Sequence, residues 1–314
     1  MEWVGVWAKE DNKILIFNLK SGVELMKIAI TGGKGGTGKS TMATAISMTL
    51  TDKYKVMLVD ADVECPDDHI ILPIKRKKIK DITNFLPIFN KESCIKCGKC
   101  ANICKQNAIV YVKDNYPILI PPQCNGCGAC MITCPSGSIN KDTQIVGSIY
   151  HGFLDKKKVG RKIAENFILI SGEIEIGCEA TSLVVNATKK HALNFQDQYD
   201  YIIIDTAAGT HCNVISALIN VNCALAVTEP TPLGCHDLEP ILLLLNKMGI
   251  KSKIIINRSN IGDSNMVKDL AKRYGSEILA EIPYEKSILK DYSHGAPVSH
   301  PKIKEFVKNW ENLK

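Results

Sequence analysis

The chain has 314 residues, of which 45% are hydrophobic and 23% are charged, and its net charge is +6. This length and composition are typical of a folded, water-soluble protein with room for more than one domain. No apolar run approaches the roughly 18 residues that a membrane-spanning helix needs, so no membrane span is predicted. The N-terminus lacks the basic start and the cleavage site of a secretory signal, which predicts a cytoplasmic location. The basic residues lack interleaved aromatic side chains, so nucleic acid is not an expected partner.

Residues 1–25 alternate apolar and polar side chains and are predicted to form a short hairpin. They contain no pattern of catalytic residues. We interpret them as an N-terminal extension of uncertain role, dispensable for nucleotide binding.

From Met26 onward, short β-branched runs alternate with amphipathic stretches, which indicates a parallel sheet covered by helices on both faces. Strands are predicted at 27–31, 55–60, 167–171, 200–205, 222–228, 252–257 and 277–282. Helices are predicted at 41–51, 180–193, 212–220, 235–248, 262–274 and 301–311. The expected fold class is α/β, with a doubly wound, mostly parallel sheet.

A glycine-rich loop lies between the first predicted strand and the first predicted helix. Residues 33–40 (GKGGTGKS) fit the phosphate-binding pattern G-x-x-x-x-G-K-[ST] in the strand–loop–helix context that it requires. Backbone N–H groups of such a loop surround phosphates, the lysine reaches the β- and γ-phosphates, and the hydroxyl of Ser40 binds Mg²⁺. The nucleotide-binding residues predicted here are Gly33, Gly35, Gly36, Thr37, Gly38, Lys39, Ser40 and Thr41.

Carboxylates stand at the ends of two other predicted strands. Asp60 and Asp62 close the apolar run 56–59, and Asp205 closes the run 201–204. Residues at i and i+2 of a strand lie on one face, and ligands of α/β sheets bind at the carboxyl ends of the strands. These three residues are therefore candidates for the same site as the glycine-rich loop.

The alternation of strands and helices fails between about 81 and 145, and this segment contains eight of the thirteen cysteines. We interpret 81–145 as an inserted domain with basic, polar flanks, so that the nucleotide domain consists of 26–80 and 146–314. The cysteines follow the bacterial ferredoxin spacing C-x₂-C-x₂-C-x₃-C, written twice. A zinc site is the alternative for paired cysteines, but the repeated spacing favours iron–sulfur clusters.

In two-cluster ferredoxins the fourth cysteine of each run ligates the cluster of the other run. Applied to this chain, the pattern predicts two [4Fe–4S] clusters. The first would be ligated by Cys94, Cys97, Cys100 and Cys134, and the second by Cys124, Cys127, Cys130 and Cys104. Among the other cysteines, Cys223 is predicted to be a core residue. Whether the remaining four bind a cluster at an interface is left open, and these are Cys65, Cys178, Cys212 and Cys235.

The second lysine of the loop, Lys34, makes the loop resemble that of the MinD/ParA/Mrp ATPases, a group related to the nitrogenase iron protein. The resemblance covers nearly all of the chain from Met26, and it implies ATP or ADP with Mg²⁺ as the cofactor. It also implies that two subunits, identical or related, close face to face over the nucleotides. Lys34 of each would then reach the phosphates bound by the other.

The same resemblance assigns roles to single residues. Asp60 and Asp205 would support the Mg²⁺ ion, and Asp62 would orient the attacking water. Lys34, Lys39, Asp62 and Asp205 are thus the predicted catalytic residues. Gly209 would offer its N–H group to the γ-phosphate, Asn257 would read the adenine base, and Pro283 would line the base pocket.

The predicted function is an ATP-hydrolysing iron–sulfur protein, in which a nucleotide-driven dimer cycle controls electron transfer through the two clusters. Its partners would be an electron donor and an acceptor protein or metallocentre, whose identities the sequence does not give. One alternative is an iron–sulfur carrier of the Mrp type, but no C-x-x-C pair follows Cys235. A second alternative is a positioning ATPase like MinD or ParA, for which the final predicted helix is short and mixed in polarity.

Overall fold

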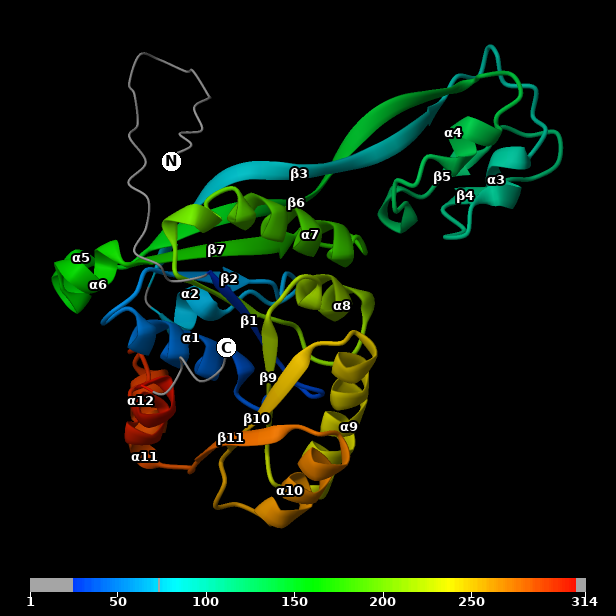
Figure 1. Ribbon diagram of the computed structural model, residues 1–314. Helices are drawn as coiled ribbons and strands as arrows, with labels where there is room; N and C mark the ends of the chain where they lie inside the picture. Colours follow the sequence, from blue (N-terminus) through cyan, green and yellow to red (C-terminus); the bar gives the residue numbers. More distant parts are fainter. Residues whose placement is uncertain (1–24, 73, 309–314) are drawn as a thin grey trace, which may run out of the picture.

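The computed structural model describes residues 25–72 and 74–308, so the hairpin predicted for the N-terminal extension lies outside the described residues except for Leu25. Figure 1 shows a large twisted sheet with helices on both faces, and a separate lobe held away from it by two long strands.

The main sheet has nine strands in the order β11-β10-β9-β1-β8-β2-β7-β6-β3. All neighbours from β11 to β7 are parallel, whereas β6 and β3 are added antiparallel at one edge. The strands are β1 (Met26–Thr31), β2 (Val56–Asp60), β3 (Lys75–Phe89), β6 (Ile139–Phe153), β7 (Phe167–Ile174), β8 (Tyr201–Asp205), β9 (Cys223–Thr228), β10 (Lys251–Asn257) and β11 (Glu277–Ile282). The predicted α/β class with a mostly parallel sheet is therefore confirmed.

Alternate residues of the central strands face opposite layers of helices. Ile28 and Ile30 of β1 share a core with α1 (Lys39–Leu50) and α12 (Pro301–Lys308). Ala29 faces the other side, with α8 (Cys212–Leu218), α9 (Pro232–Lys247) and α10 (Ser264–Arg273). The remaining helices around the sheet are α2 (Asp68–Ile71), α5 (Lys156–Val159), α6 (Arg161–Glu165), α7 (Thr181–Leu193) and α11 (Lys286–Ser293).

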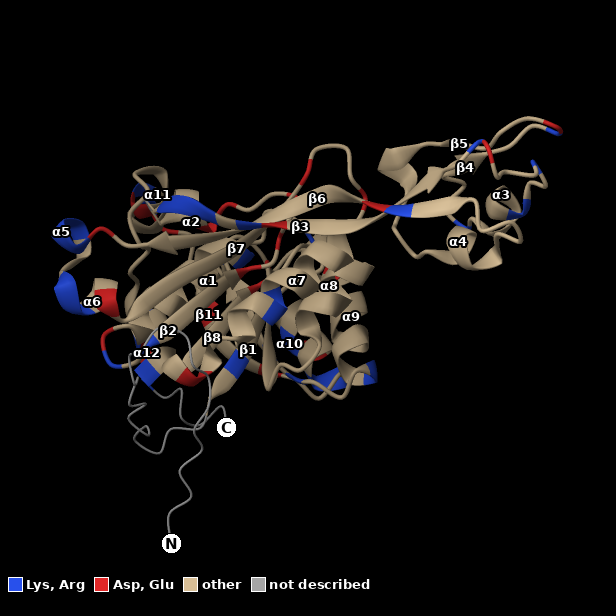
Figure 2. Cartoon of the chain, turned by 90° about the horizontal axis from the view of Figure 1, so that it is seen from above, with Lys and Arg blue, Asp and Glu red and all other residues tan. Residues whose placement is uncertain are grey.

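Strands β3 and β6 form a long antiparallel pair, which we call the arm. β6 pairs with β7 only over 147–152, so its first half has β3 as its one strand neighbour among the described residues. Figure 2 shows Lys and Arg residues along the inner part of β3, which is the edge strand of the sheet. The sequence predicts polar flanks here instead of strands, because the basic run 75–80 has no alternation of apolar residues. Charged side chains of this kind protect a sheet edge from pairing with other chains.

The outer end of the arm carries residues 90–138, which we call the cysteine lobe (Figure 1). It contains two short helices, α3 (Lys99–Ile103) and α4 (Ala129–Thr133), and a small ribbon of β4 (Ile109–Val110) with β5 (Ile118–Leu119). Phe85, Phe89 and Ile139 of the arm pack into the core of the lobe together with cysteine side chains. The lobe is therefore built directly onto the arm by apolar contact.

Candidate nucleotide and cysteine sites

The phosphate-binding loop runs from the end of β1 to the start of α1. Its backbone has positive φ angles at Gly36 (79°) and Gly38 (95°), where glycine avoids the steric cost that other residues meet. A Cβ atom on Gly33 would overlap the backbone of Asp237 in α9, so this position also requires glycine. The loop leads into α1 at Lys39, and free N–H groups at a helix start favour a bound anion.

The two lysines of the loop have different surroundings. Lys39 is buried, and its Nζ atom donates a hydrogen bond to the carbonyl oxygen of Lys34 at 3.3 Å. The side chain of Lys34 is half-buried and has no hydrogen bond or ion pair to any described residue. Lys39 is thus held inside the loop, while Lys34 is free to contact a group outside it.

Two hydrogen bonds from residues after or at the end of other strands hold the backbone of the loop. Asn257, at the end of β10, donates from Nδ2 to the carbonyl oxygen of Thr37 at 2.8 Å, and its Oδ1 accepts from the N–H of Arg258 at 3.0 Å. The N–H of Gly209 donates to the carbonyl oxygen of Gly32 at 3.0 Å. Both side-chain groups of Asn257 are therefore used within the protein, and its adenine role stays a prediction. The phosphate contact of Gly209 and the base contact of Pro283, half-buried after β11, also stay predictions.

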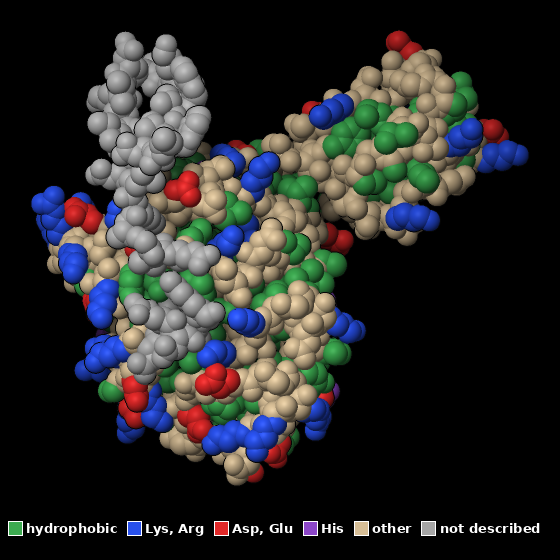
Figure 3. All heavy atoms as spheres, in the orientation of Figure 1, with side chains coloured by type: hydrophobic (Ala, Val, Ile, Leu, Met, Phe, Trp, Pro, Cys, Tyr) green, Lys and Arg blue, Asp and Glu red, His purple; other side chains and the backbone are tan. Residues whose placement is uncertain are grey.

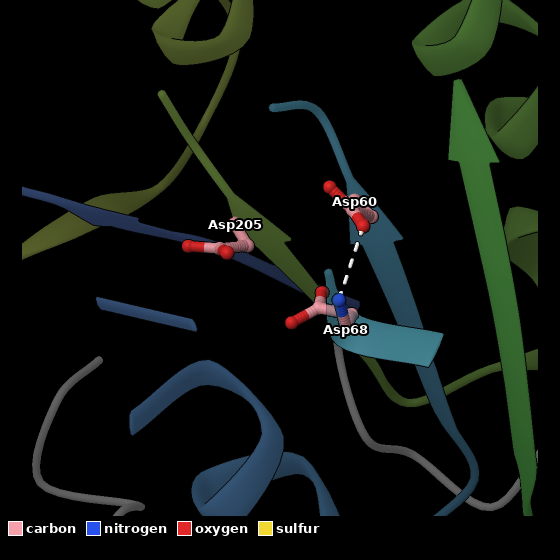
Figure 4. Close-up of side chains that lie close together, drawn as sticks. All are labelled: Asp60, Asp68 and Asp205. Atoms are coloured by element: carbon pink, nitrogen blue, oxygen red, sulfur yellow. Dashed lines mark hydrogen bonds between the residues drawn. The ribbon is translucent and has the colours of Figure 1, made fainter. Parts of the chain in front are cut away.

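Three carboxylates meet at the carboxyl edge of the sheet, as Figure 4 shows. Asp60 and Asp205 are paired across β2 and β8, and Asp68 is the first residue of α2. All three side chains are fully buried, and one oxygen of each lies within 4.8 Å of an oxygen of the other two. Asp62 is half-buried beside them, and its N–H donates to Oδ1 of Asp60 at 3.2 Å.

Burial raises the pKa values of these carboxyl groups because water no longer stabilises their charge. The pKa of Asp60 is raised well above its usual value, first by burial and then by Asp205 and Asp67. The pKa of Asp68 is raised in the same way, by burial and then by Asp60. Burial raises the pKa of Asp205 to about 7, although the Ser40 hydroxyl and the Lys39 ammonium oppose the shift. Negative charge is therefore costly at this site unless a cation joins it.

The residues fit a divalent cation. Both carboxylate oxygens of Asp68 and both of Asp205 are buried without a hydrogen bond to any described residue. Mg²⁺ prefers oxygen ligands, and a cation bound here would compensate the charges. The sequence predicts Asp60 and Asp205 at this site but not Asp68, which lies on a helix and not at a strand end. A signal was present in the run Asp67-Asp68, which follows a few residues after Asp62.

The eight cysteines of the lobe line two cavities. One is lined by cysteines 94, 97 and 100 together with Cys134, and the other by cysteines 124, 127 and 130 together with Cys104. Each cavity thus combines three cysteines of one run with the last cysteine of the other run. Four thiols around one space suit an iron–sulfur cluster, whose ligands are thiolates.

The two cysteine runs have the same backbone conformation, offset by 30 residues. Positive φ angles occur at Lys96 and Gly126, at Gly98 and Gly128, and at Asn107 and Gly137. These turns direct the first three thiols of each run toward one side, while α3 or α4 carries the fourth away. The shared geometry explains how two similar sequences produce two similar cavities.

The thiols of the lobe differ in their readiness to lose a proton. Burial raises the pKa of Cys130 to about 11. Burial also acts on Cys134, but hydrogen bonds from the hydroxyls of Ser138 and Ser136 prevail and lower its pKa to about 7. The Sγ atom of Cys134 lies 3.3 Å from Oγ of Ser138 and 3.7 Å from Oγ of Ser136.

The remaining cysteines lie outside both cavities. Cys65 and Cys212 are exposed, whereas Cys178 and Cys235 are half-buried. The segments that carry the two exposed residues, the loop of Cys65 and the start of α8, are joined by a hydrogen bond from Asn213 to Glu64, at 3.2 Å. Cys223 is buried in β9, in agreement with its predicted core role.

A family model matches a long segment of the chain that includes the phosphate-binding loop. The model of the CobQ/CobB/MinD/ParA nucleotide binding domain matches residues 28–298. The chain belongs to this family. The predicted P-loop ATPase superfamily is thereby confirmed, with ATP binding as a property of the family.

Two uncharacterized proteins of Methanocaldococcus jannaschii are similar to this chain. One is 36% identical over 275 residues, which cover 87% of the chain and 91% of the relative. The other is 30% identical over 294 residues, which cover 92% and 97%. The septum site-determining protein MinD of Thermotoga maritima is 24% identical over 297 residues, which cover 91% of the chain and 85% of the relative.

Solved structures share the fold. MinD of Pyrococcus horikoshii in complex with Mg-ADP aligns with a TM-score of 0.55 and 19% identity, over 93% of this chain and 96% of that one. A ParA family ATPase of Chlorobium tepidum aligns with a TM-score of 0.52 and 17% identity, over 91% and 98%.

These similarities support a MinD- or ParA-like ATPase, the second alternative of the sequence analysis, better than they support electron transfer. No described helix is long and apolar enough to cross a membrane.

Proposed function

We propose that this chain is a MinD/ParA-type ATPase whose nucleotide cycle controls electron transfer through two [4Fe–4S] clusters in the cysteine lobe. In this proposal 26–80 and 146–314 form the ATPase domain and 81–145 the inserted ferredoxin domain. An electron donor and an acceptor protein are its partners.

The observation that carries the proposal is the arrangement of the eight lobe cysteines. They line two cavities in two sets of four, and each set draws its last cysteine from the other run. A positioning ATPase has no use for two such sets, whereas an electron carrier can pass electrons between two clusters held close together.

The free side chain of Lys34 supports the nucleotide half of the proposal. Lys39 is fixed to the carbonyl oxygen of Lys34, so Lys39 serves the nucleotide of its own subunit. Lys34 has no described partner and is available to the phosphates bound by a second subunit. A cation that reaches the phosphates only in the closed dimer would couple hydrolysis to closure.

The surface of the cysteine lobe suits a protein partner. Figure 3 shows hydrophobic side chains on the visible face of the lobe. The lobe exposes large apolar side chains, among them Ile95 beside the first cavity and Ile132 on α4, which are 62% and 82% exposed. Exposed apolar groups near a redox centre favour transient docking of an electron-transfer partner.

The test begins with anaerobic reconstitution of the full chain and measurement of its iron content. About eight iron atoms per chain are expected for two clusters, whereas bound zinc would contradict the iron–sulfur assignment.

EPR spectra and reduction potentials are then recorded without nucleotide, with ADP and with ATP. ATP is expected to change the spectra or potentials, and Lys34→Ala is expected to bind ATP but lose this change. Lys53→Ala, at an exposed lysine outside the loop, is the matched control. Clusters indifferent to nucleotide in the wild type would overturn the coupling.

A positioning function is the second candidate, and the similarity to MinD over 91% of the chain favours it. It predicts ATP-dependent binding to a large surface instead of an ATP effect on the clusters. Sedimentation with anionic lipid vesicles, with ATP and with ADP, distinguishes the two. Binding to vesicles that requires ATP would support positioning, and cluster transfer to an apo-acceptor would support the carrier alternative.

A further inference from the structure

Asp60, Asp68 and Asp205 bring three carboxyl groups together in the interior of the protein. In the described residues no lysine, arginine or histidine forms an ion pair with any of the three, and Nζ of Lys39 is bonded to a carbonyl oxygen. Buried carboxylates without a cation repel one another and lose their hydration. The fold brings them together nonetheless, from β2, β8 and α2 (Figure 4).

Asp68 is the residue that points to a ligand. Its side chain is fully buried, and neither of its carboxylate oxygens has a hydrogen-bond partner among the described residues. Its backbone N–H donates to Oδ2 of Asp60 at 3.4 Å. A divalent cation bound here would satisfy oxygens of all three residues.

Asp68 also connects this site to the arm. The N–H of Leu72 donates to the carbonyl oxygen of Asp68 at 2.9 Å, and β3 begins at Lys75. Leu72 and Ile74 are buried in one core cluster with Leu154, which directly follows β6. A shift of α2 would therefore act on the inner ends of both strands of the arm.

We propose that Asp60, Asp68 and Asp205 bind a divalent cation, Mg²⁺ or Mn²⁺, in the absence of nucleotide, and that Asp68 transmits the occupancy of this site through α2 to the arm. The cation site stands independently of the proposed electron transfer. The link to the arm rests on that proposed function, because it gives ATP binding a route to the cysteine lobe.

The test is a titration of the nucleotide-free, full-length protein with Mn²⁺, with its clusters oxidised so that they give no EPR signal. Free Mn²⁺ is followed by its own EPR signal. The wild type is expected to bind one Mn²⁺ tightly, and Asp68→Asn to bind it at least about tenfold more weakly. Glu64→Gln, an exposed acid of the same loop, is expected to bind as the wild type does. Absence of tight binding in the wild type, or equal binding by Asp68→Asn, would overturn the proposal.

Thermal unfolding distinguishes the loss of the cation site from a general loss of stability in the variant. Mn²⁺ is expected to raise the melting temperature of the wild type. Asp68→Asn is expected to melt above the wild type without a cation, because one repelling charge is gone, and to respond little to Mn²⁺. A variant that is less stable without cation and gains as much from Mn²⁺ would contradict the role of Asp68.

Hydrogen exchange tests the link to the arm. Mn²⁺ is expected to slow amide exchange in α2 and in the first half of β3 in the wild type, and not in Asp68→Asn. Mn²⁺ binding without any change in β3 would overturn the link. Clusters that ignore ATP would overturn the proposed electron transfer but leave the Mn²⁺ titration unaffected, so the two failures are distinguishable.

Discussion

The side chain of Asn257 ties the end of β10 to the phosphate-binding loop, through a hydrogen bond of 2.8 Å to the carbonyl oxygen of Thr37. The bond is buried, so its loss leaves a backbone acceptor without a partner in the loop that must bind phosphate. The bond therefore links the phosphate-binding loop directly to β10, which is separated from β1 by β9 in the sheet.

Removal of this bond by Asn257→Ala is expected to weaken ATP binding and to lower the free energy of unfolding by about 1–2 kcal/mol. A fluorescent ATP analogue measures the affinity, and urea unfolding measures the stability. Asn246→Ala is the control, because the side-chain amide of Asn246 donates an exposed hydrogen bond to the carbonyl oxygen of Tyr274 at 3.3 Å. Unchanged ATP affinity in Asn257→Ala would show that the bond does not shape the loop.

A pair of histidines joins the arm to α7. Nε2 of His151 in β6 and Nε2 of His191 in α7 are 2.8 Å apart, and both rings pack against Phe195. Burial lowers the pKa of both histidines, and His151 and Lys80 lower that of His191 further. The unfolded chain therefore takes up protons at a higher pH than the folded one, and acid favours unfolding.

The contribution of this histidine pair to the free energy of unfolding is accordingly expected to fall as the pH drops from about 7 to about 5. The buried carboxyl groups Asp60, Asp68 and Asp205 act in the opposite direction, because their raised pKa values make the folded state take up protons first. Full stability is present above the unfolded pKa of about 6.5 and is lost toward the lowered folded values. His191→Gln should reduce this pH dependence, whereas His294→Gln, at an exposed histidine, should retain it. Urea unfolding at several pH values measures both, and equal slopes for the two variants would contradict the role of the pair.

Lys189 of α7 holds the end of α8. Its Nζ atom donates to the carbonyl oxygens of Ser216, Ala217 and Ile219 at 2.7–2.8 Å. Lys189→Met is expected to lower the free energy of unfolding by about 1–3 kcal/mol, because three carbonyls at a helix end lose their donor. Lys190→Met, at the exposed neighbour, should change stability little, and an equal loss in both variants would refute the capping role.

The sequence predicted the parallel strands well, because strands such as 201–205 are continuous apolar runs that only a sheet covered on both faces would bury. It did not predict the arm. The inner part of β3 is held by polar contacts such as the ion pair of Arg76 with Glu173 at 2.8 Å and the stacking of Arg76 on Tyr150. Such contacts join residues that are far apart in the chain, so no local sequence pattern predicts them.

The residues of the candidate site were likewise predicted only in part. Asp60 and Asp205 could be placed from their strand ends, because parallel strands align their carboxyl ends. Asp68 could not, because its burial depends on how α2 folds back over β2 and β8. The pairing of the cysteines into two sets followed from their spacing, since the ferredoxin pattern fixes local turns that the lobe repeats at Gly98 and Gly128.

Ser138 and Ala108 are one aligned pair of positions at which the two cysteine runs differ. Ser138 lies 3.3 Å from the sulfur of Cys134, while the residue 30 positions earlier, beside Cys104, is the buried Ala108. A hydroxyl that donates to a cluster sulfur withdraws negative charge and raises the reduction potential. Ser138→Ala is therefore expected to lower the potential of the cluster bound by Cys134, and Ala108→Ser to raise that of the other. Redox titration with EPR after anaerobic reconstitution measures both. A shift of the same sign in both variants would show that packing, and not the hydroxyl, sets the difference.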